Sequence, residues 1–226
     1  MAVTIVAIDG PSGVGKSTTS RRVAEVLDLP HIDTGAMYRA MALKARRAGV
    51  PLTDEDRLEG IAASTAIELE GSGNAQRVLL DGEDVSTDIR TPEISMAASR
   101  ISAVPAVRRV LVQLQQQIGR RSGGVLEGRD IGTKVFPETS HKFFLTARPE
   151  VRAARRLTDL QNQGVAQSLE QVLLEMDTRD RRDTTRADSP LTWDETYTVL
   201  DTSQMTIDQV VAAIVEQVRG SIRGPS

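Results

Sequence analysis

The sequence predicts an α/β fold, with a central parallel sheet between two layers of helices. Short apolar runs of strand length alternate with amphipathic helical patterns along most of the chain, which is typical of βαβ units. Residues 58–92 instead have a hairpin pattern, and residues 149–190 are helical and rich in arginine. We therefore expect a small antiparallel β subdomain inserted into the fold, and a helical lid. The strands expected in the parallel sheet are residues 3–8, 31–33, 125–126, 142–146 and 197–201.

Composition limits the class of protein. At 226 residues, with 39% hydrophobic and 26% charged residues, the chain suits one α/β domain over residues 1–226. It has no cysteine and a net charge of −3, which disfavours a disulfide framework, cysteine-ligated zinc and a generally basic nucleic-acid binder. No apolar run approaches the ~18 residues of a membrane span. We expect a cytoplasmic protein, monomeric by default, that binds neither nucleic acid nor membrane.

The most specific motif is the glycine loop Gly10-Pro11-Ser12-Gly13-Val14-Gly15-Lys16-Ser17, which matches G-x-x-x-x-G-K-[ST]. It follows the first expected strand and precedes a helix from Thr18, the context in which this P-loop motif binds phosphates. The glycines let backbone N–H groups converge on phosphate oxygens. Lys16 can reach the β- and γ-phosphates, and the Ser17 hydroxyl can take one position on Mg²⁺. The loop predicts a nucleoside triphosphate site without saying how the phosphate is used.

A second polar cluster is expected at the same edge of the sheet. Strand 31–33 completes a βαβ unit and turns into a helix at Thr34. Because ligands sit at the carboxyl ends of parallel strands, Asp33, Thr34 and Arg39 lie where a second substrate could approach the P-loop. A helix cap at Thr34 and a solvated helix face at Arg39 are equally open alternatives.

The inserted segment reads as a hairpin. Residues 66–70 and 77–80 are its strands, around a turn at residues 71–74. A second turn follows at residues 81–84. No low-complexity linker surrounds this unit, so we expect it to be a subdomain rather than a separate module.

Two helices are expected between residues 92 and 121, because Pro105 interrupts the helical pattern. Ser99, Arg100, Arg108 and Arg109 are the polar candidates on them, with ordinary surface as the alternative.

Strand 125–126 is followed by Glu127-Gly128-Arg129-Asp130-Ile131-Gly132, which again places charge at the ligand edge of the sheet. A structural ion pair between Arg129 and Asp130 is the simplest alternative to a binding role.

The lid segment contains two expected helices. Pro149 can begin the first, and a capping-box pattern from Ser168 opens the second. The second leads into residues whose helical spacing puts them on one face, Arg179, Arg182, Asp183 and Arg186. We favour a phosphate clamp over a solvated face. An arginine lid that closes also excludes water, which favours a small-molecule kinase over a simple ATPase. The chain then continues through strand 197–201 to a terminal helix that begins after Thr206.

Together these motifs resemble those of bacterial cytidylate kinases, over essentially the whole chain. The resemblance is carried by residues 8–18, 33–39, 81–85, 127–133 and 179–187. It implies a P-loop NTPase fold with a core, a monophosphate-binding subdomain at residues 58–92 and a lid at residues 149–190. It also implies ATP-dependent phosphorylation of CMP and dCMP with Mg²⁺.

The resemblance further implies roles for individual residues. ATP would be bound by Gly10, Pro11, Ser12, Gly13, Val14, Gly15, Lys16, Ser17 and Thr18, and Mg²⁺ by Ser17. Lys16, Arg179 and Arg182 would be catalytic. CMP would be bound by Asp33, Thr34, Arg39, Ser99, Arg108, Arg129, Asp130, Asp183 and Arg186.

Within the CMP set, Thr34 and Arg39 would hold the acceptor phosphate and Asp183 the ribose, while Arg129 and Arg186 would sit on phosphates. Ser99, Arg108 and Asp130 would read the cytosine edge. Cytosine offers an N4 amino donor, so an acceptor such as Asp130 can select it. No general base is required, because the nucleophile is already a phosphate oxygen.

Two other functions stay open at this point. One is a P-loop kinase for another acceptor, such as AMP, UMP or a small hydroxylated metabolite. The other is a GTP switch or an ATP-driven regulator. The sequence has no N-K-x-D segment, which counts against the switch.

Overall fold

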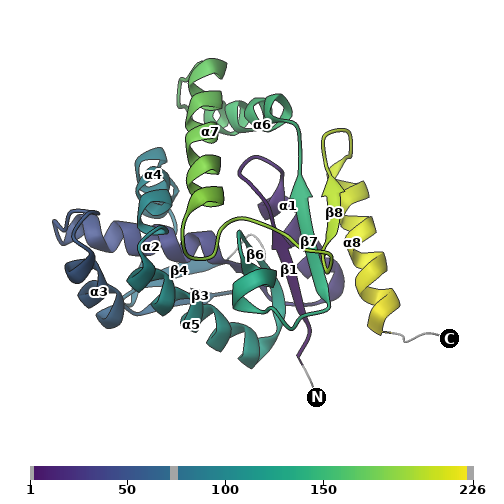
Figure 1. Ribbon diagram of the computed structural model, residues 1–226, viewed down its shortest axis with the longest axis horizontal. Coiled ribbons are helices and arrows are strands. Elements are labelled where there is room, and N and C mark those ends of the chain that lie inside the picture. Colours follow the sequence, from purple (N-terminus) through teal and green to yellow (C-terminus); the bar gives the residue numbers. More distant parts are fainter. Residues whose placement is uncertain (1–2, 72–75, 223–226) are drawn as a thin grey trace.

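The computed structural model describes residues 3–71 and 76–222. Its main sheet has five parallel strands in the order β2-β6-β1-β7-β8 (Figure 1). All five carboxyl ends therefore meet at one edge, and the predicted parallel α/β sheet is confirmed. The strands are β1 (Ile5–Asp9), β2 (His31–Asp33), β6 (Gly124–Gly128), β7 (His141–Thr146) and β8 (Thr198–Asp201).

Alternating side chains of β1 pack on both faces of this sheet, as the pleat of a strand requires. Val6 and Ile8 lie in one core with residues of α1 and α8, and Ile5 and Ala7 lie in another with residues of α5 and η3. The sheet is thus the middle of three layers. The covering elements are α1 (Lys16–Leu27), α8 (Ile207–Ile222), α5 (Pro105–Ser122) and the short π-helical turn η3 (Ile131–Val135).

A separate core joins the small antiparallel sheet to the helices around it. The hairpin predicted over residues 66–80 is confirmed by the pairing of β3 with β4; apart from Gly71, its predicted turn lies outside the described residues. These elements are α2 (Thr34–Arg47), α3 (Glu55–Ser64), β3 (Ile67–Glu70), β4 (Arg77–Leu80), β5 (Glu83–Asp84), η2 (Asp88–Arg90) and α4 (Pro92–Ile101).

The second predicted turn, residues 81–84, is shorter than expected. Asp81 and Gly82 have φ of 51° and 84°, the backbone of a two-residue hairpin turn, so Glu83 and Asp84 are free to pair with β4 as β5. Residue 58, the expected start of the insertion, lies within α3 rather than between elements.

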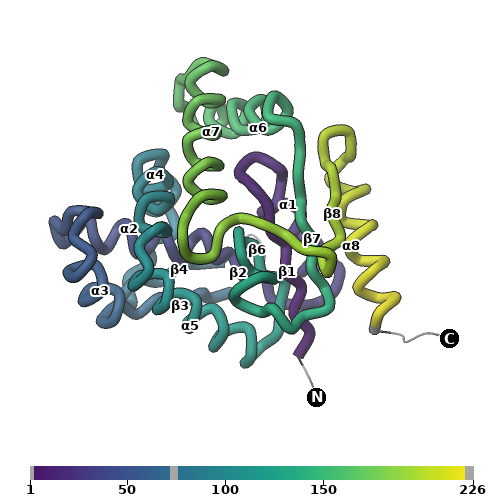
Figure 2. The backbone as a smooth tube through the Cα atoms, in the orientation of Figure 1, coloured from purple at the N-terminus to yellow at the C-terminus, as the bar shows by residue number. Residues whose placement is uncertain are grey.

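Two helices, α6 (Pro149–Asn162) and α7 (Leu169–Thr185), stand beyond the carboxyl edge of the sheet (Figure 1). They share a small core of their own, and the predicted capping box at Ser168 is present. From the end of α7 a connecting segment, residues 186–197, crosses the molecule to reach β8 (Figure 2). Over the described ranges, we find no helix with both the length and the apolar character of a membrane span.

Candidate active site

A cavity of about 300 Å³ opens at the carboxyl edge of the sheet. Its wall is built from the P-loop, the ends of β2 and β6, the helices α4 and α5, and the lid helices α6 and α7. This edge is where the topology of a parallel sheet brings strand ends and helix N-termini together. The predicted residues that line the cavity are Ser12, Gly13, Gly15, Lys16, Ser17, Thr18, Asp33, Thr34, Arg39, Arg108, Arg129, Asp130, Arg179, Asp183 and Arg186.

The P-loop has the backbone that its glycines predict. Gly10, Gly13 and Gly15 have φ of 146°, 76° and 93°, which L side chains rarely adopt. A Cβ on Gly10 would lie 2.2 Å from the carbonyl oxygen of Leu145. Helix α1 begins at Lys16 without a side-chain cap, so its first N–H groups and its positive dipole end are available to an anion.

Lys16 is nearly buried, with 7% of its surface exposed, and its ammonium donates to the carbonyl of Pro11 over 2.5 Å. Burial and the nearby guanidinium of Arg129 lower the pKa of Lys16 below its usual value. A phosphate in the loop would counter both effects, since an opposite charge favours the protonated amine.

A polar chain runs from the P-loop to β6. Ser17 Oγ donates to Glu127 Oε2 over 2.8 Å, and His31 Nε2 lies 3.3 Å from Glu127 Oε1. Glu127 is 4% exposed, and within the described part of the chain its Oε1 has no hydrogen-bond partner. Sequence reasoning assigned Glu127 no role. Its place, one residue before the end of a buried strand whose carboxyl end lies at the ligand edge of the sheet, was the signal that could have found it.

The end of β2 forms the next part of the wall. The Asp33 carboxylate accepts from the Ala36 N–H over 3.0 Å and from Arg39 over 2.8 Å, so Asp33 is the N-cap of α2. The cap considered for Thr34 is therefore wrong; Thr34 Oγ1 donates to the Glu127 carbonyl over 2.7 Å. Burial alone would raise the pKa of Asp33, but Arg39 and the Ala36 N–H outweigh it and the pKa is lowered.

A buried ion pair forms another part of the cavity wall. Arg108, 1% exposed, donates to Asp130 and to the carbonyl of Ser102. Its guanidinium carbon lies 5.7 Å from the centre of the Tyr38 ring, and Asp130 Oδ1 is also 3.5 Å from Arg186. Arg108 comes from the first turn of α5 and Asp130 from the turn after β6, so the pair joins two consecutive elements at the cavity.

Arg129 pairs with a residue of α7 rather than with its sequence neighbour Asp130. Its Nε donates to Asp183 over 2.9 Å, so the alternative of an ion pair between Arg129 and Asp130 is wrong. Burial would raise the pKa of Asp183, but Arg129 with Arg179 and Arg186 lowers it. Burial and the charge of Arg129 lower the pKa of Arg179 to about 10, which still leaves it a cation at neutral pH. These groups carry three positive charges against one negative charge, so the cluster favours an anion.

Ser99 and Arg182 are not part of this cavity. Arg182 donates to Ser99 Oγ over 2.8 Å, and both line an adjoining cavity of about 290 Å³ between α4 and α7. From α4, Ala98 lines the main cavity, whereas Ser95 lines both. A helix turns about 100° per residue, so neighbouring positions face different cavities.

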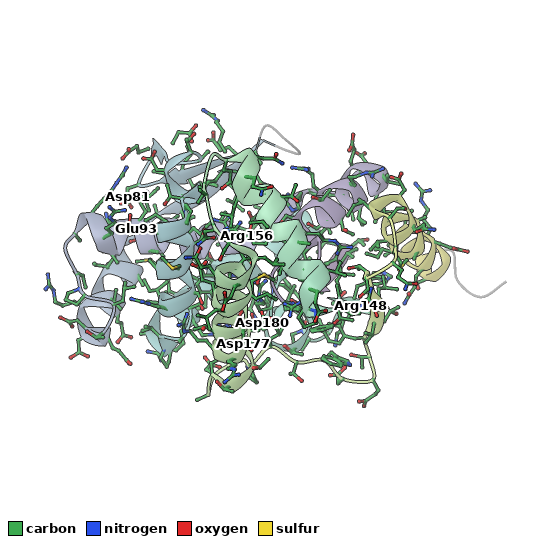
Figure 3. The ribbon with its side chains drawn as sticks, turned by 90° about the horizontal axis from the view of Figure 1, so that it is seen from above. Asp81, Glu93, Arg148, Arg156, Asp177 and Asp180 are labelled. Carbon is green, nitrogen blue, oxygen red and sulfur yellow. The ribbon has the colours of Figure 1, made fainter. Side chains whose placement is uncertain are left out.

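The lid helices add residues that sequence reasoning missed. Arg156 and Asp159 of α6 line the main cavity; helical spacing from Pro149 was the available signal. Arg152 ties the lid to the P-loop, donating to the Ser12 carbonyl over 3.2 Å and to Asp180 of α7 over 2.5 Å. Figure 3 looks down on α6 and α7, with Arg156 and Asp180 labelled on them.

Comparisons with known proteins agree with one another. The model of the cytidylate kinase family matches residues 6–220. A cytidylate kinase of Syntrophotalea carbinolica is 49% identical over 214 residues, covering 95% of this chain and 91% of that relative. One of Caldanaerobacter subterraneus is 45% identical, covering 97% and 96%. A crystal structure of an uncharacterised protein from Eubacterium ventriosum shares the fold, with a TM-score of 0.54 at 12% identity over 96% of this chain and 98% of its own.

Proposed function

Since the chain belongs to the cytidylate kinase family, we propose that it transfers the γ-phosphoryl group of ATP to CMP and dCMP, giving CDP and dCDP. It is a nucleoside monophosphate kinase, a phosphotransferase whose acceptor is itself a phosphate. The observation that carries the reaction is one cavity that is lined both by the P-loop and by the Arg108–Asp130 pair. Family membership argues against a different acceptor and against a nucleotide-driven regulator.

The P-loop supplies the donor half of the site. Residues 10–18 would cradle the ATP phosphates, with Lys16 near the β- and γ-phosphates and the N-terminus of α1 aimed at the same anion. Arg156 and Arg179 face this region from the lid helices. We propose that residues 149–190 act as a lid that excludes water, so that the acceptor rather than water takes the phosphoryl group.

The residues beside the P-loop fit a Mg²⁺ ion. In the described ranges no three His, Asp or Glu side chains cluster as a metal site, so an ion here would depend on phosphates and water as well. Mg²⁺ commonly binds proteins in that way, through one or two oxygen side chains. The Ser17 hydroxyl and Glu127 Oε1, which accepts no hydrogen bond from the described residues, are suitable oxygens. When bound, the ion would neutralise charge on the β- and γ-phosphates.

The other half of the cavity would hold CMP. Asp130 can accept from the cytosine N4 amino group, and Arg108 can donate to N3 or O2. We propose Asp183 for the ribose, Thr34 and Arg39 for the acceptor phosphate, and Arg129 and Arg186 for phosphate contacts. Ser99 would reach the base only if α7 released it from Arg182, because the two are hydrogen-bonded. Residues 58–92 are the proposed monophosphate-binding subdomain.

Transfer then needs alignment and charge more than covalent chemistry. The CMP phosphate oxygen is the nucleophile, so no general base is assigned. Arg179, which lies near Arg129 and Asp183, is the residue proposed to stabilise charge on the transferring group. Location and assembly stay predictions from the sequence: a cytoplasmic monomer that binds neither nucleic acid nor membrane.

The test is ADP release from ATP and Mg²⁺, alone and with CMP, dCMP, UMP or AMP. We expect release with CMP and dCMP, weaker release with UMP, and little with ATP alone. Lys16→Met is the control, because it keeps the side-chain length but removes the charge at the β- and γ-phosphates. ADP release that does not depend on CMP would overturn the proposal.

A further inference from the structure

Asp9 is a fully buried carboxylate at the junction of the two halves of the site. It ends β1, between β6 and β7, and the next residue is Gly10 of the P-loop. Asp9 is not among the described residues that line the cavity. Its role must therefore lie in what it holds.

The Asp9 carboxylate binds the turn that carries the base-reading residue. Oδ1 accepts from the Ile131 N–H over 2.9 Å, and Oδ2 accepts from the Gly132 N–H over 3.0 Å. Both N–H groups immediately follow Asp130. The Asp130 carbonyl accepts from the Lys134 N–H over 2.9 Å, so the peptide that follows Asp130 is held through its carbonyl as well as through its N–H.

A third donor comes from the segment that leaves the lid. Tyr197, the last residue of the connecting segment, donates its hydroxyl to Asp9 Oδ2 over 2.9 Å. A Cβ on Gly132 would lie 2.5 Å from the Tyr197 hydroxyl, so only glycine lets the phenol reach the carboxylate. Asp9 thus joins the P-loop strand, the Asp130 turn and the connecting segment.

From this junction we infer that Asp9 is a positioning residue for base selection, which sets the Asp130 carboxylate relative to the P-loop. The inference rests on the proposed function. A carboxylate suits this task, because only an acceptor-only group can satisfy two parallel N–H donors and a hydroxyl at once. In Asp9→Asn the amide oxygen can accept from some of these donors, but the NH₂ group opposes another. The turn would then lose its fixed position and Asp130 its alignment.

The experiment compares kcat/KM for CMP and for UMP in the wild type and in Asp9→Asn. We expect the CMP:UMP ratio to fall about tenfold, mainly through KM for CMP, while KM for ATP changes less than about twofold. In an Asp130→Asn background, Asp9→Asn should change the ratio no further, because the two residues act in one path. Tyr197→Phe removes one of three donors, so we expect a fall of about threefold.

A matched control is Thr139→Val at the opposite end of β1, where Thr139 Oγ1 donates to the Ile5 carbonyl over 2.6 Å. It should lower the melting temperature without changing the CMP:UMP ratio. If Asp9→Asn does not fold, Tyr197→Phe carries the test alone. An unchanged ratio, or equal losses for CMP, UMP and ATP, would overturn the inference. A wild type that ignores CMP would instead overturn the proposed function.

Discussion

The Ser17 hydroxyl donates to Glu127 over 2.8 Å, and this single bond joins the first turn of α1 to the carboxyl end of β6. One oxygen of the Glu127 carboxylate is thereby oriented, and the other lies 3.3 Å from His31 Nε2. Ser17 Oγ and Glu127 Oε1 are therefore held beside the P-loop in a fixed arrangement.

Glu127→Gln tests whether this arrangement holds Mg²⁺. Glutamine keeps the volume and can still accept from Ser17, but it lacks the negative charge. We expect the Mg²⁺ concentration for half-maximal rate to rise about tenfold or more, with KM for CMP little changed. Initial rates over a Mg²⁺ titration at saturating ATP and CMP measure this. An unaltered Mg²⁺ requirement would exclude Glu127 from the metal site.

Arg179→Ala and Arg182→Ala separate the two lid arginines proposed as catalytic. Arg179 lines the main cavity, whereas Arg182 is bonded to Ser99 in the adjoining one. We expect Arg179→Ala to lower kcat about 100-fold or more, with a smaller effect on CMP binding, because its contact is made in the transition state. Arg182→Ala should lower kcat far less. Steady-state kinetics with direct CMP binding by calorimetry checks both, and the reverse order would assign catalysis to Arg182.

The two halves of the site differ in how well they could be predicted. The P-loop is local: strand, glycines, lysine and helix are contiguous, so the sequence pattern predicts their geometry. Asp130 and Arg108 were both assigned to the cytosine edge, but their ion pair was not predicted, because Arg108 comes from a helix whose rotation depends on packing. The same limit explains why Arg182 lines the adjoining cavity. Neighbouring positions on a helix differ by about 100°, so the spacing of residues 179, 182, 183 and 186 does not show which cavity each side chain faces.

Asp130→Ala should impair both selection and folding. Removing the carboxylate leaves Arg108, 1% exposed, with Asp188 at 3.9 Å as its remaining acid partner. Breaking a buried ion pair by removing one partner costs about 3–5 kcal/mol of unfolding free energy. We expect a loss of that order in urea unfolding, together with a higher KM for CMP and a smaller preference for CMP over UMP.

A matched control exists one residue away from Arg108. Arg109 pairs with Glu59 over 3.0 Å, but both side chains are more than half exposed. Glu59→Gln should therefore change stability little, because water screens exposed pairs. Equal losses in the two variants would show that burial does not set the cost of breaking the Arg108 pair.

Asp9 predicts a pH dependence of stability whose sign follows from its burial. Burial raises the pKa of Asp9 to about 6, against 3.8 for an ordinary aspartate, and Asp130 adds to the rise while three hydrogen bonds oppose it. Below pH 3.8 both folded and unfolded chains hold the proton. Between the two pKa values the unfolded chain releases it first, so rising pH favours unfolding. The contribution of Asp9 to the free energy of unfolding is fully present at low pH and is lost by about pH 6. This loss is a change of about 3 kcal/mol.

Other groups act in the opposite direction, because the pKa values of Asp33 and Asp183 are lowered. The effect of Asp9 must therefore be measured as a difference, by urea unfolding of wild type and Asp9→Asn from pH 4.5 to 7.5. Asparagine does not titrate, so the variant should be most destabilised relative to wild type at pH 4.5, and the gap should narrow as pH rises. Tyr197→Phe removes a hydrogen bond to the Asp9 carboxylate and should raise the pKa of Asp9 further. The pH range over which the contribution of Asp9 is lost should then lie higher. Parallel profiles for wild type and Asp9→Asn would mean that Asp9 does not change its protonation over this range.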